Sequence, residues 1–200
     1  AVAVDARFKV GYPKPSTDPY NHLAIHPYPI HLITDEQLND GTDIVIRPIR
    51  PEDAEIEQAF IRGLSAESRY FRFLNSIHEL SLEMLVRFTQ IDYHNEMALV
   101  AIHQADEGEE EIGVVRYMTN PDKKTCEFAI VVSDKWQGKG IARLLMNKLI
   151  DVARNRSLEV MEGQVLANNY RMLELMASLN FSISNDPTDN GIKIVRINLS

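Results

Sequence analysis

Gln137-Gly138-Lys139-Gly140-Ile141-Ala142 lies between an apolar run, residues 128–132, and an amphipathic segment, residues 141–152. The apolar run predicts a strand and the amphipathic segment a helix, so the glycines form a turn at the helix N-terminus. Free backbone N–H groups and the positive end of the helix dipole meet there, and glycine lets the main chain approach an anion closely. The stretch therefore predicts a phosphate or pyrophosphate site, to which Lys139 adds a positive charge.

The glycine spacing distinguishes this turn from two common phosphate loops. The Walker pattern ends in Gly-Lys-Ser/Thr and the dinucleotide fingerprint has three glycines, and the stretch matches neither. Its pattern, Gln-x-x-Gly-x-Ala, resembles the acyl-CoA pyrophosphate loop of the GNAT superfamily of N-acetyltransferases. The resemblance implies that the loop holds acetyl-CoA through Gln137, Gly138, Lys139, Gly140, Ile141 and Ala142. The alternative is an ordinary glycine turn that caps a helix.

Composition narrows the class of protein. The 200 residues are 44% apolar and 25% charged, which suits one globular domain with an appendage. The 21 basic and 29 acidic residues give a formal net charge of −8, which argues against a nucleic-acid partner. Apolar runs fall short of the roughly 20 residues of a membrane span, and the histidines show no metal-ligand spacing, so neither membrane nor metal is expected. A single cysteine, Cys126, favours a reducing, cytoplasmic location.

The first forty residues differ from the rest. They are rich in proline and hold too few apolar side chains for a core of their own, so we expect an arm, residues 1–40, before a domain, residues 41–200. Residues 4–7 and 22–29 resemble the end of the ATP-grasp part of NDP-forming acyl-CoA synthetases. The alternative is an N-terminal arm that packs on the domain behind it.

The order of elements after residue 41 is regular. We expect strands near residues 44–46, 97–102, 112–117, 125–132, 162–166 and 192–199, with helices over 51–64, from 81, over 141–152 and over 169–179. Strands 97–102 and 112–117 form a hairpin, and strand 125–132 runs antiparallel to its predecessor. This order, with Ile46-Arg47-Pro48 and Asp53 at its start, resembles that of GNAT proteins. The resemblance implies an α/β fold whose mixed, mostly antiparallel sheet is flanked by helices.

A cluster of aromatic and basic residues narrows the resemblance. Residues 65–73, Ser-Ala-Glu-Ser-Arg-Tyr-Phe-Arg-Phe, resemble a signature of bacterial Pat-type protein lysine acetyltransferases. In those proteins a GNAT domain often follows an acyl-CoA synthetase-like region. The resemblance therefore implies that the chain is the C-terminal part of such a fusion. It also implies an acyltransferase with a protein lysine as acceptor, acetyl-CoA as cosubstrate and an acyl-CoA synthetase as a candidate partner.

Acetyl transfer to lysine requires a base, because an amine of pKa near 10.4 is protonated at neutral pH. Glu127 is the candidate, since it is an isolated carboxylate in an apolar strand where burial would raise its pKa. The matching glutamate of Pat-type proteins is taken as the general base. The alternative is a glutamate that faces solvent or pairs with an arginine. Cys126 faces away from Glu127 on an alternating strand, which favours direct attack in a ternary complex.

Other candidate residues lie along the path of the cosubstrate. The backbone of Ile130, Val131 and Val132 is expected to hold the pantetheine arm, as a strand edge holds a peptide. Asn169 caps a helix, and in the superfamily the matching asparagine also reaches coenzyme A. The position where many relatives carry an acidic tyrosine holds Met176, so we assign no general acid. A small-amine acetyltransferase and a non-catalytic acetyl-CoA sensor remain alternatives.

Overall fold

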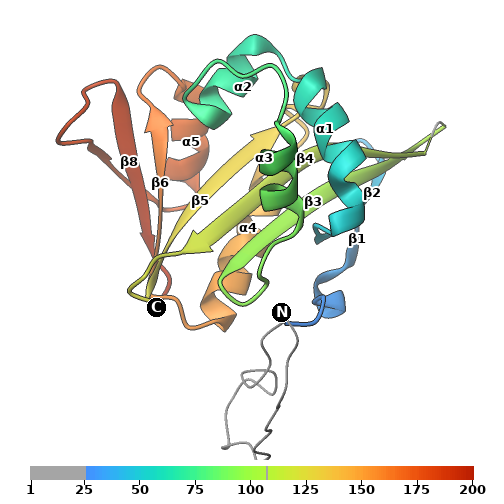
Figure 1. Ribbon diagram of the computed structural model, residues 1–200. Helices are drawn as coiled ribbons and strands as arrows, with labels where there is room; N and C mark the ends of the chain where they lie inside the picture. Colours follow the sequence, from blue (N-terminus) through green and yellow to red (C-terminus); the bar gives the residue numbers. More distant parts are fainter. Residues whose placement is uncertain (1–25, 107) are drawn as a thin grey trace, which may run out of the picture.

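The computed structural model describes residues 26–106 and 108–200, and the expectations for residues 1–25 lie outside this range. Within it the chain forms an eight-stranded sheet in the order β1-β2-β3-β4-β5-β6-β8-β7 (Figure 1). Every neighbouring pair is antiparallel except β5 and β6, which run parallel. The expected α/β class and mostly antiparallel sheet are confirmed.

The strands are β1 (Thr34–Gln37), β2 (Asp43–Pro48), β3 (Glu96–Ala105), β4 (Gly108–Thr119), β5 (Thr125–Val132), β6 (Val160–Leu166), β7 (Ser182–Asn185) and β8 (Ile192–Asn198). The helices are α1 (Ala54–Gly63), α2 (Ala66–Phe73), α3 (Leu82–Thr89), α4 (Ile141–Asn155) and α5 (Tyr170–Ser178). Short 3-10 turns occur at η1 (Ile30–Leu32), η2 (Pro51–Asp53) and η3 (Asp134–Trp136).

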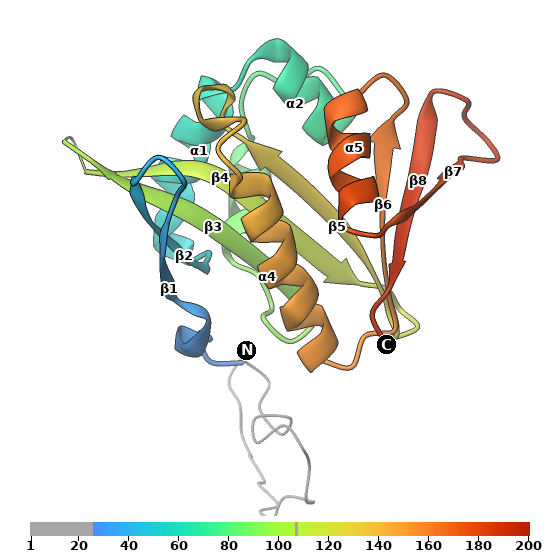
Figure 2. The ribbon, with the colours of Figure 1, turned by 180° about the vertical axis from the view of Figure 1, so that it is seen from behind.

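Helices cover both faces of the sheet. The helices α1, α2 and α3 lie on one face, and α4 and α5 on the other (Figures 1 and 2). The larger apolar core joins α4 and α5 to alternate residues of β5 such as Phe128 and Ile130, whereas Val131 belongs to the core beneath α1 and α3. Alternation along β5 therefore assigns Glu127, Ala129 and Val131 to the α1–α3 face.

The sheet opens between its two parallel strands. Pairing of β5 with β6 covers only Thr125, Cys126 and Glu127 against residues 160–162. Beyond Glu127 the strands diverge, and β6 pairs with β8 alone. Residues 128–132 therefore have a partner strand on the β4 side only. This free edge is where the fold creates room for an extended ligand.

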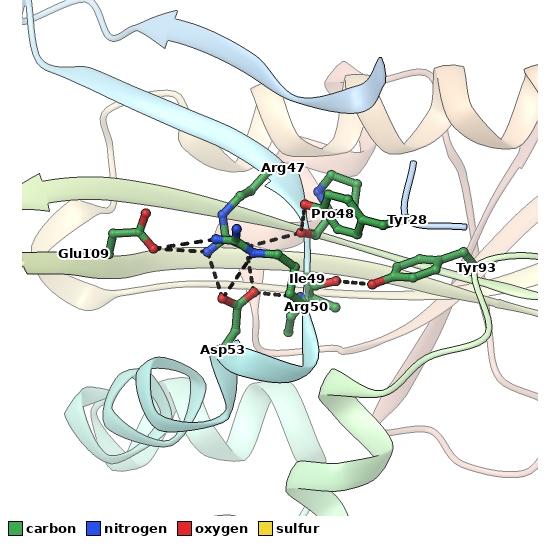
Figure 3. Close-up of polar contacts among 8 residues, drawn as sticks. All are labelled: Tyr28, Arg47, Pro48, Ile49, Arg50, Asp53, Tyr93 and Glu109. Carbon is green, nitrogen blue, oxygen red and sulfur yellow. Dashed lines mark hydrogen bonds and ion pairs between the residues drawn. The ribbon is translucent and has the colours of Figure 1, made fainter. Parts of the chain in front are cut away.

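A buried ion pair fixes the start of the sheet to the first helix. Arg47 Nη1 and Nη2 donate to the Asp53 carboxylate at 2.6 and 2.8 Å, and Asp53 also accepts from the Arg50 backbone N–H (Figure 3). Nearby, the Tyr28 and Tyr93 hydroxyls donate to the Pro48 and Ile49 carbonyls. Arg47 and Asp53, which were singled out in the sequence, are both buried and thus help to hold the fold together.

Not every element of the fold was predicted from the sequence. The strand β5 has the expected bounds, and the expected hairpin is β3 and β4. Helix α2, between the N-cap Ser65 and the left-handed Leu74, and the short polar strands β1 and β7 were not predicted. Because β1 pairs with β2, the sheet begins at Thr34, before the expected domain start at residue 41.

Candidate active site

The glycine turn presents open backbone at the start of α4. Gly138 and Gly140 have φ of +80° and +89°, a conformation that favours glycine, and nothing lies within 4 Å of where a Cβ would stand. Gly140 is the N-cap of α4, and the N–H groups of the helix's first turn have no acceptor within the helix. The local geometry thus offers N–H donors and a positive dipole end to an anion.

A cavity of about 1070 Å³ extends from this turn into the opening of the sheet. Its wall includes parts of α2, β5, α4, β6 and α5, and its volume lies near the upper end for small-molecule sites. Of the residues singled out from the sequence, those lining it are Ile130, Val131, Val132, Gln137, Gly138, Gly140, Ile141, Ala142 and Asn169. Lys139 and Glu127 do not line the cavity.

The Lys139 side chain has other partners. Its Nζ lies 2.7 Å from Asp40 Oδ2 and 4.6 Å from the centre of the Trp136 ring. The ammonium group is therefore bound to Asp40, in the turn before β2, a contact that was not predicted from the sequence. Two arginines, Arg143 on α4 and Arg171 on α5, do line the cavity and supply positive charge there. Sequence reasoning missed both, because a single exposed arginine on a helix carries no distinguishing signal.

The free edge of β5 offers alternating backbone groups to the cavity. Ser133 N–H donates to the Ile112 carbonyl on the β4 side, at 2.9 Å. Because successive residues of a strand direct their backbone groups to opposite sides, Val132 and Ile130 direct theirs toward the opening. In agreement, the Val132 carbonyl accepts from Gln137 Nε2 at 3.3 Å. The backbone of Val131 faces β4, and its side chain lines the cavity wall.

Glu127 is exposed to solvent, so the expectation that this side chain is buried was wrong. It pairs in register with Met118 of β4 and Glu162 of β6, and Met118 is itself exposed. The physical reason is that α1, α2 and α3 leave this end of the sheet face uncovered. Cys126, its neighbour, is fully buried on the opposite face, and burial raises the pKa of its thiol to about 12. Cys126 therefore faces away from Glu127, as expected.

A polar clasp, formed by Asp134, Gln137, Ser65 and Ser68, joins the glycine turn to α2. Asp134 accepts hydrogen bonds from the Ser65 N–H and from the Ser65 and Ser68 hydroxyls, each at 2.8 Å. These bonds hold the pKa of Asp134 below its usual value despite partial burial. Gln137 Nε2 also lies 3.4 Å from Ser68 Oγ. The clasp couples the position of α2 to that of the glycine turn, and it was not predicted from the sequence.

Asn169 and its neighbours form the wall on the side of α5. Asn169 Oδ1 accepts from Met172 N–H at 3.2 Å, which is the N-cap role expected from the sequence, and the residue also lines the cavity. Met176, the position for which no general acid was assigned, is fully buried, and its thioether has no ionisable proton to supply. Tyr170 lines the cavity with 70% of its surface exposed.

A buried carboxyl pair lies between α1 and β4. Glu57 and Glu111 are 1% and 3% exposed, and Arg116 Nη2 lies 3.4 Å from Glu57 Oε1. Burial, followed by the negative charge of Glu57, raises the pKa of Glu111 well above its usual range. Burial therefore favours the neutral form of Glu111, whose two carboxyl oxygens have no hydrogen-bond partner among the described residues, and the Glu57 carboxyl group faces Arg116.

The protonation of Glu111 predicts how stability depends on pH. Its pKa is higher in the folded than in the unfolded chain, so its contribution is complete below the unfolded pKa and is lost as pH rises through the folded pKa. Glu111→Gln, which stays neutral, is expected to raise the melting temperature by roughly 3 °C at pH 9 and to change it little at pH 5. Thermal melts of both variants check this, with the exposed Glu110→Gln as control. Parallel pH curves for wild type and Glu111→Gln would contradict the assignment.

Residues 26–106 and 108–200 contain neither a metal-binding cluster nor a membrane-spanning helix. No cluster of three His, Cys, Asp or Glu side chains in these ranges could hold a metal ion. No helix in the same ranges is both long enough and apolar enough to cross a membrane.

Fold and cavity agree with comparison to known proteins: residues 64–181 match the model of the acetyltransferase (GNAT) family, so the chain belongs to that family. It is 40% identical to acetyltransferase PA5475 of Pseudomonas aeruginosa, over 82% of this chain and 88% of that protein. The GNAT domain of S. lividans PAT superposes with a TM-score of 0.78 at 29% identity, covering 86% of this chain and 99% of that one.

More distant relatives differ in their acceptors or overall length. Acetyltransferase Pat of Mycolicibacterium smegmatis is 28% identical over 72% of this chain, which spans only 42% of that relative's length. L-amino acid N-acyltransferase MnaT of Escherichia coli is 34% identical over 37% of this chain and 43% of its own length. The comparisons therefore establish an acetyltransferase and leave the acceptor to be argued from the site.

Proposed function

We propose that the protein transfers an acetyl group from acetyl-CoA to the ε-amine of a protein lysine. One observation supports this most strongly: a single cavity connects the glycine turn with the free edge of β5, and the exposed Glu127 lies just before this edge, two residues from Ala129 in the cavity wall. A thioester cosubstrate needs this combination of an anion site, an extended groove and an accessible base.

The cavity residues fit acetyl-CoA by the chemistry of their donors. The N–H groups at the start of α4, next to Gly138 and Gly140, suit the pyrophosphate, and Arg143 and Arg171 add positive charge. The backbone groups of Ile130 and Val132 suit the amides of the pantetheine arm, and an N–H on this edge suits the thioester oxygen as it becomes an oxyanion. The Asn169 amide can bond the same arm while it caps α5.

Glu127 acts in this proposal as the base that removes a proton from the lysine ammonium, directly or through water. The neutral amine nitrogen then bonds to the acetyl carbon and loses its surplus proton to solvent. The carbon–sulfur bond breaks as the carbonyl re-forms, and the thiolate leaves and takes a proton from solvent. Because a thiolate is a fairly good leaving group, no protein acid is required. The exposure of Glu127 suits an acceptor that reaches the site on the surface of another protein.

The assignment of a protein lysine rests on the likeness to Pat in sequence and to the GNAT domain of PAT in structure. Acetyl transfer from radiolabelled acetyl-CoA tests this assignment. The enzyme is incubated first with a bacterial protein extract and purified acyl-CoA synthetases, and then with a panel of polyamines and amino acids. Label on protein that mass spectrometry places on lysine supports the proposal. Label on small amines alone overturns it.

A small-amine acceptor is the second candidate, because the chain is also similar to an L-amino acid N-acyltransferase over residues that make up 37% of its length. The same acceptor panel separates the two: amino acids acetylated faster than any lysine-containing protein or peptide would favour this candidate. No covalent acyl-enzyme is needed in either case.

Direct attack predicts that the lone cysteine is dispensable. The Cys126 thiol is buried on the face opposite Glu127, and its pKa of about 12 leaves almost no thiolate at neutral pH. Cys126→Ala is therefore expected to keep kcat within about twofold of wild type. Steady-state kinetics at saturating acetyl-CoA check this, with thermal melts to exclude loss of folding. A loss of most activity in folded enzyme would indicate an acyl-cysteine route.

A further inference from the structure

Arg72 presents an unpaired guanidinium group to the cavity. It lies on α2 and lines the cavity beside Ser68 and Phe71. Within residues 26–106 and 108–200, the Arg72 side chain forms neither a hydrogen bond nor an ion pair, and its guanidinium group lies over aromatic rings. The guanidinium carbon lies 5.0 Å from the centre of the Phe73 ring and 6.0 Å from that of Phe88. A partly buried arginine that lacks a carboxylate partner is uncommon and calls for a role.

The charges behind Arg72 leave its own charge uncompensated. Glu57 of α1 is the acid that interacts with Arg72, and Arg116 of β4 lies 3.4 Å from that same carboxylate. Burial raises the pKa of Glu111 of β4, which disfavours a negative charge on that side chain. Burial, followed by the like charge of Arg116, lowers the pKa of Arg72 to about 10, so it remains a cation at neutral pH. Two guanidinium groups thus share one carboxylate.

The cavity side offers little further compensation. Asp134, the acid of the clasp, is exposed to solvent and already accepts three hydrogen bonds from serines. Glu67 lies on the wall near the start of α2 and is exposed to solvent. The remaining charged groups that line the cavity, Arg143 and Arg171, are positive.

Arg72 lies on the sheet face that carries Glu127. Arg116, which interacts with Arg72, pairs in register with Ala129, and Ala129 lines the cavity two residues from Glu127. The start of the free edge of β5 is therefore next to this positive charge, and a thioester within reach of Glu127, the proposed base, lies at this end of the edge. An amine that approaches the thioester there comes within range of the Arg72 charge.

We propose that Arg72 lowers the pKa of the acceptor amine in the bound complex by disfavouring its ammonium form. The inference rests on the proposed function and adds a second contribution to deprotonation beside Glu127. It answers a physical need, because a lysine amine has a solution pKa near 10.4 and the exposed Glu127 is in contact with water. A fixed cation in a partly buried site shifts such an equilibrium by one or more pKa units.

The dependence of kcat on pH tests the proposal, since it reports ionisations within the ternary complex. With both substrates saturating, Arg72→Gln is expected to move the acid limb of the kcat profile upward by about one pH unit. Its kcat falls about tenfold at pH 7 and approaches wild type near pH 9.5. KM for a lysine peptide stays equal or falls, because repulsion of the ammonium is removed. Arg72→Lys keeps the charge and is expected to keep the wild-type profile.

Two controls separate charge from structure. Arg87→Met removes an exposed positive charge from neighbouring α3 and is expected to leave the profile unchanged. A peptide in which the acceptor lysine is replaced by S-aminoethylcysteine has an amine of lower pKa, and the defect of Arg72→Gln is expected to shrink with it. Thermal melts confirm that each variant is folded.

A kcat that falls by one factor at every pH in Arg72→Gln would overturn the proposal, and so would an equal defect with both peptides. Should Arg72→Gln fail to fold, the wild-type profile alone decides: an acid limb at the pKa of the free peptide amine overturns it. If wild type acetylates small amines and no lysine, the proposed function fails, whereas the Arg72 profile measured with that amine still tests the inference.

Discussion

Glu127→Ala is expected to reduce kcat by about two to four orders of magnitude while the Kd for acetyl-CoA stays near the wild-type value. General-base catalysis has this typical size, and the residue stands outside the cavity wall, so its removal takes away no contact expected for the cosubstrate. Steady-state kinetics at saturating substrates give kcat, and calorimetry gives the Kd for acetyl-CoA. A loss of affinity equal to the loss of rate would instead indicate a binding role.

The adjacent strand offers a matched control for Glu127. Glu162 pairs with Glu127 in register, is partly exposed on the same face and lies 3.8 Å from Arg196. Glu162→Ala removes one carboxylate from the same surface and is expected to leave kcat within about threefold of wild type. Unchanged turnover in Glu127→Ala together with a large loss in Glu162→Ala would show that the base lies on β6 and not on β5. Loss in both variants would indicate that the carboxylates act as a pair.

The elements predicted well are those whose signals lie within one segment. The apolar run of β5 and the amphipathic pattern of α4 fix a strand, a helix and the glycine turn between them, and all three were located correctly. The short strands β1 and β7 were missed because they carry mostly polar side chains and exist only through pairing with β2 and β8. Their pattern provides no local indication of such a partner.

The site was predicted less completely, because several of its properties depend on segments distant in sequence. The pattern of β5 shows that Glu127 faces away from Cys126, but only the positions of α1–α3 determine that this end of the face is uncovered. Likewise, Lys139 is diverted by Asp40, a residue 99 positions earlier. The hydrogen bonds that Asp134 accepts from Ser65 and Ser68 join residues 66 to 69 positions apart. No local periodicity encodes such contacts.

These long-range contacts link ligand binding to the arrangement of α2. The clasp ties the turn that precedes α4 to the N-terminus of α2, and α2 carries Arg72 into the same cavity. Order in the glycine turn is therefore expected to stabilise the helix that completes the acceptor side. We therefore expect cosubstrate affinity to depend more on the glycine turn than on Glu127.

Gly140→Ala is expected to weaken acetyl-CoA binding by at least about tenfold, because it places a methyl group in the open space at the start of α4. The backbone there has φ of +89°, so alanine also costs about 1 kcal/mol of stability. Calorimetry of the folded variant gives the affinity, and thermal or urea unfolding gives the stability. The two effects must be separated before the affinity can be interpreted.

Gly41 provides the control for that separation. It has a φ of +85°, nothing within 4 Å of its missing Cβ, and no place in the cavity wall. Gly41→Ala therefore introduces nearly the same backbone strain at the turn between β1 and β2. Both variants are expected to lose similar stability, and only Gly140→Ala to lose affinity for acetyl-CoA. Equal affinities in the two variants would show that the main chain around Gly140 does not approach the cosubstrate, and would remove the basis for placing its pyrophosphate at α4.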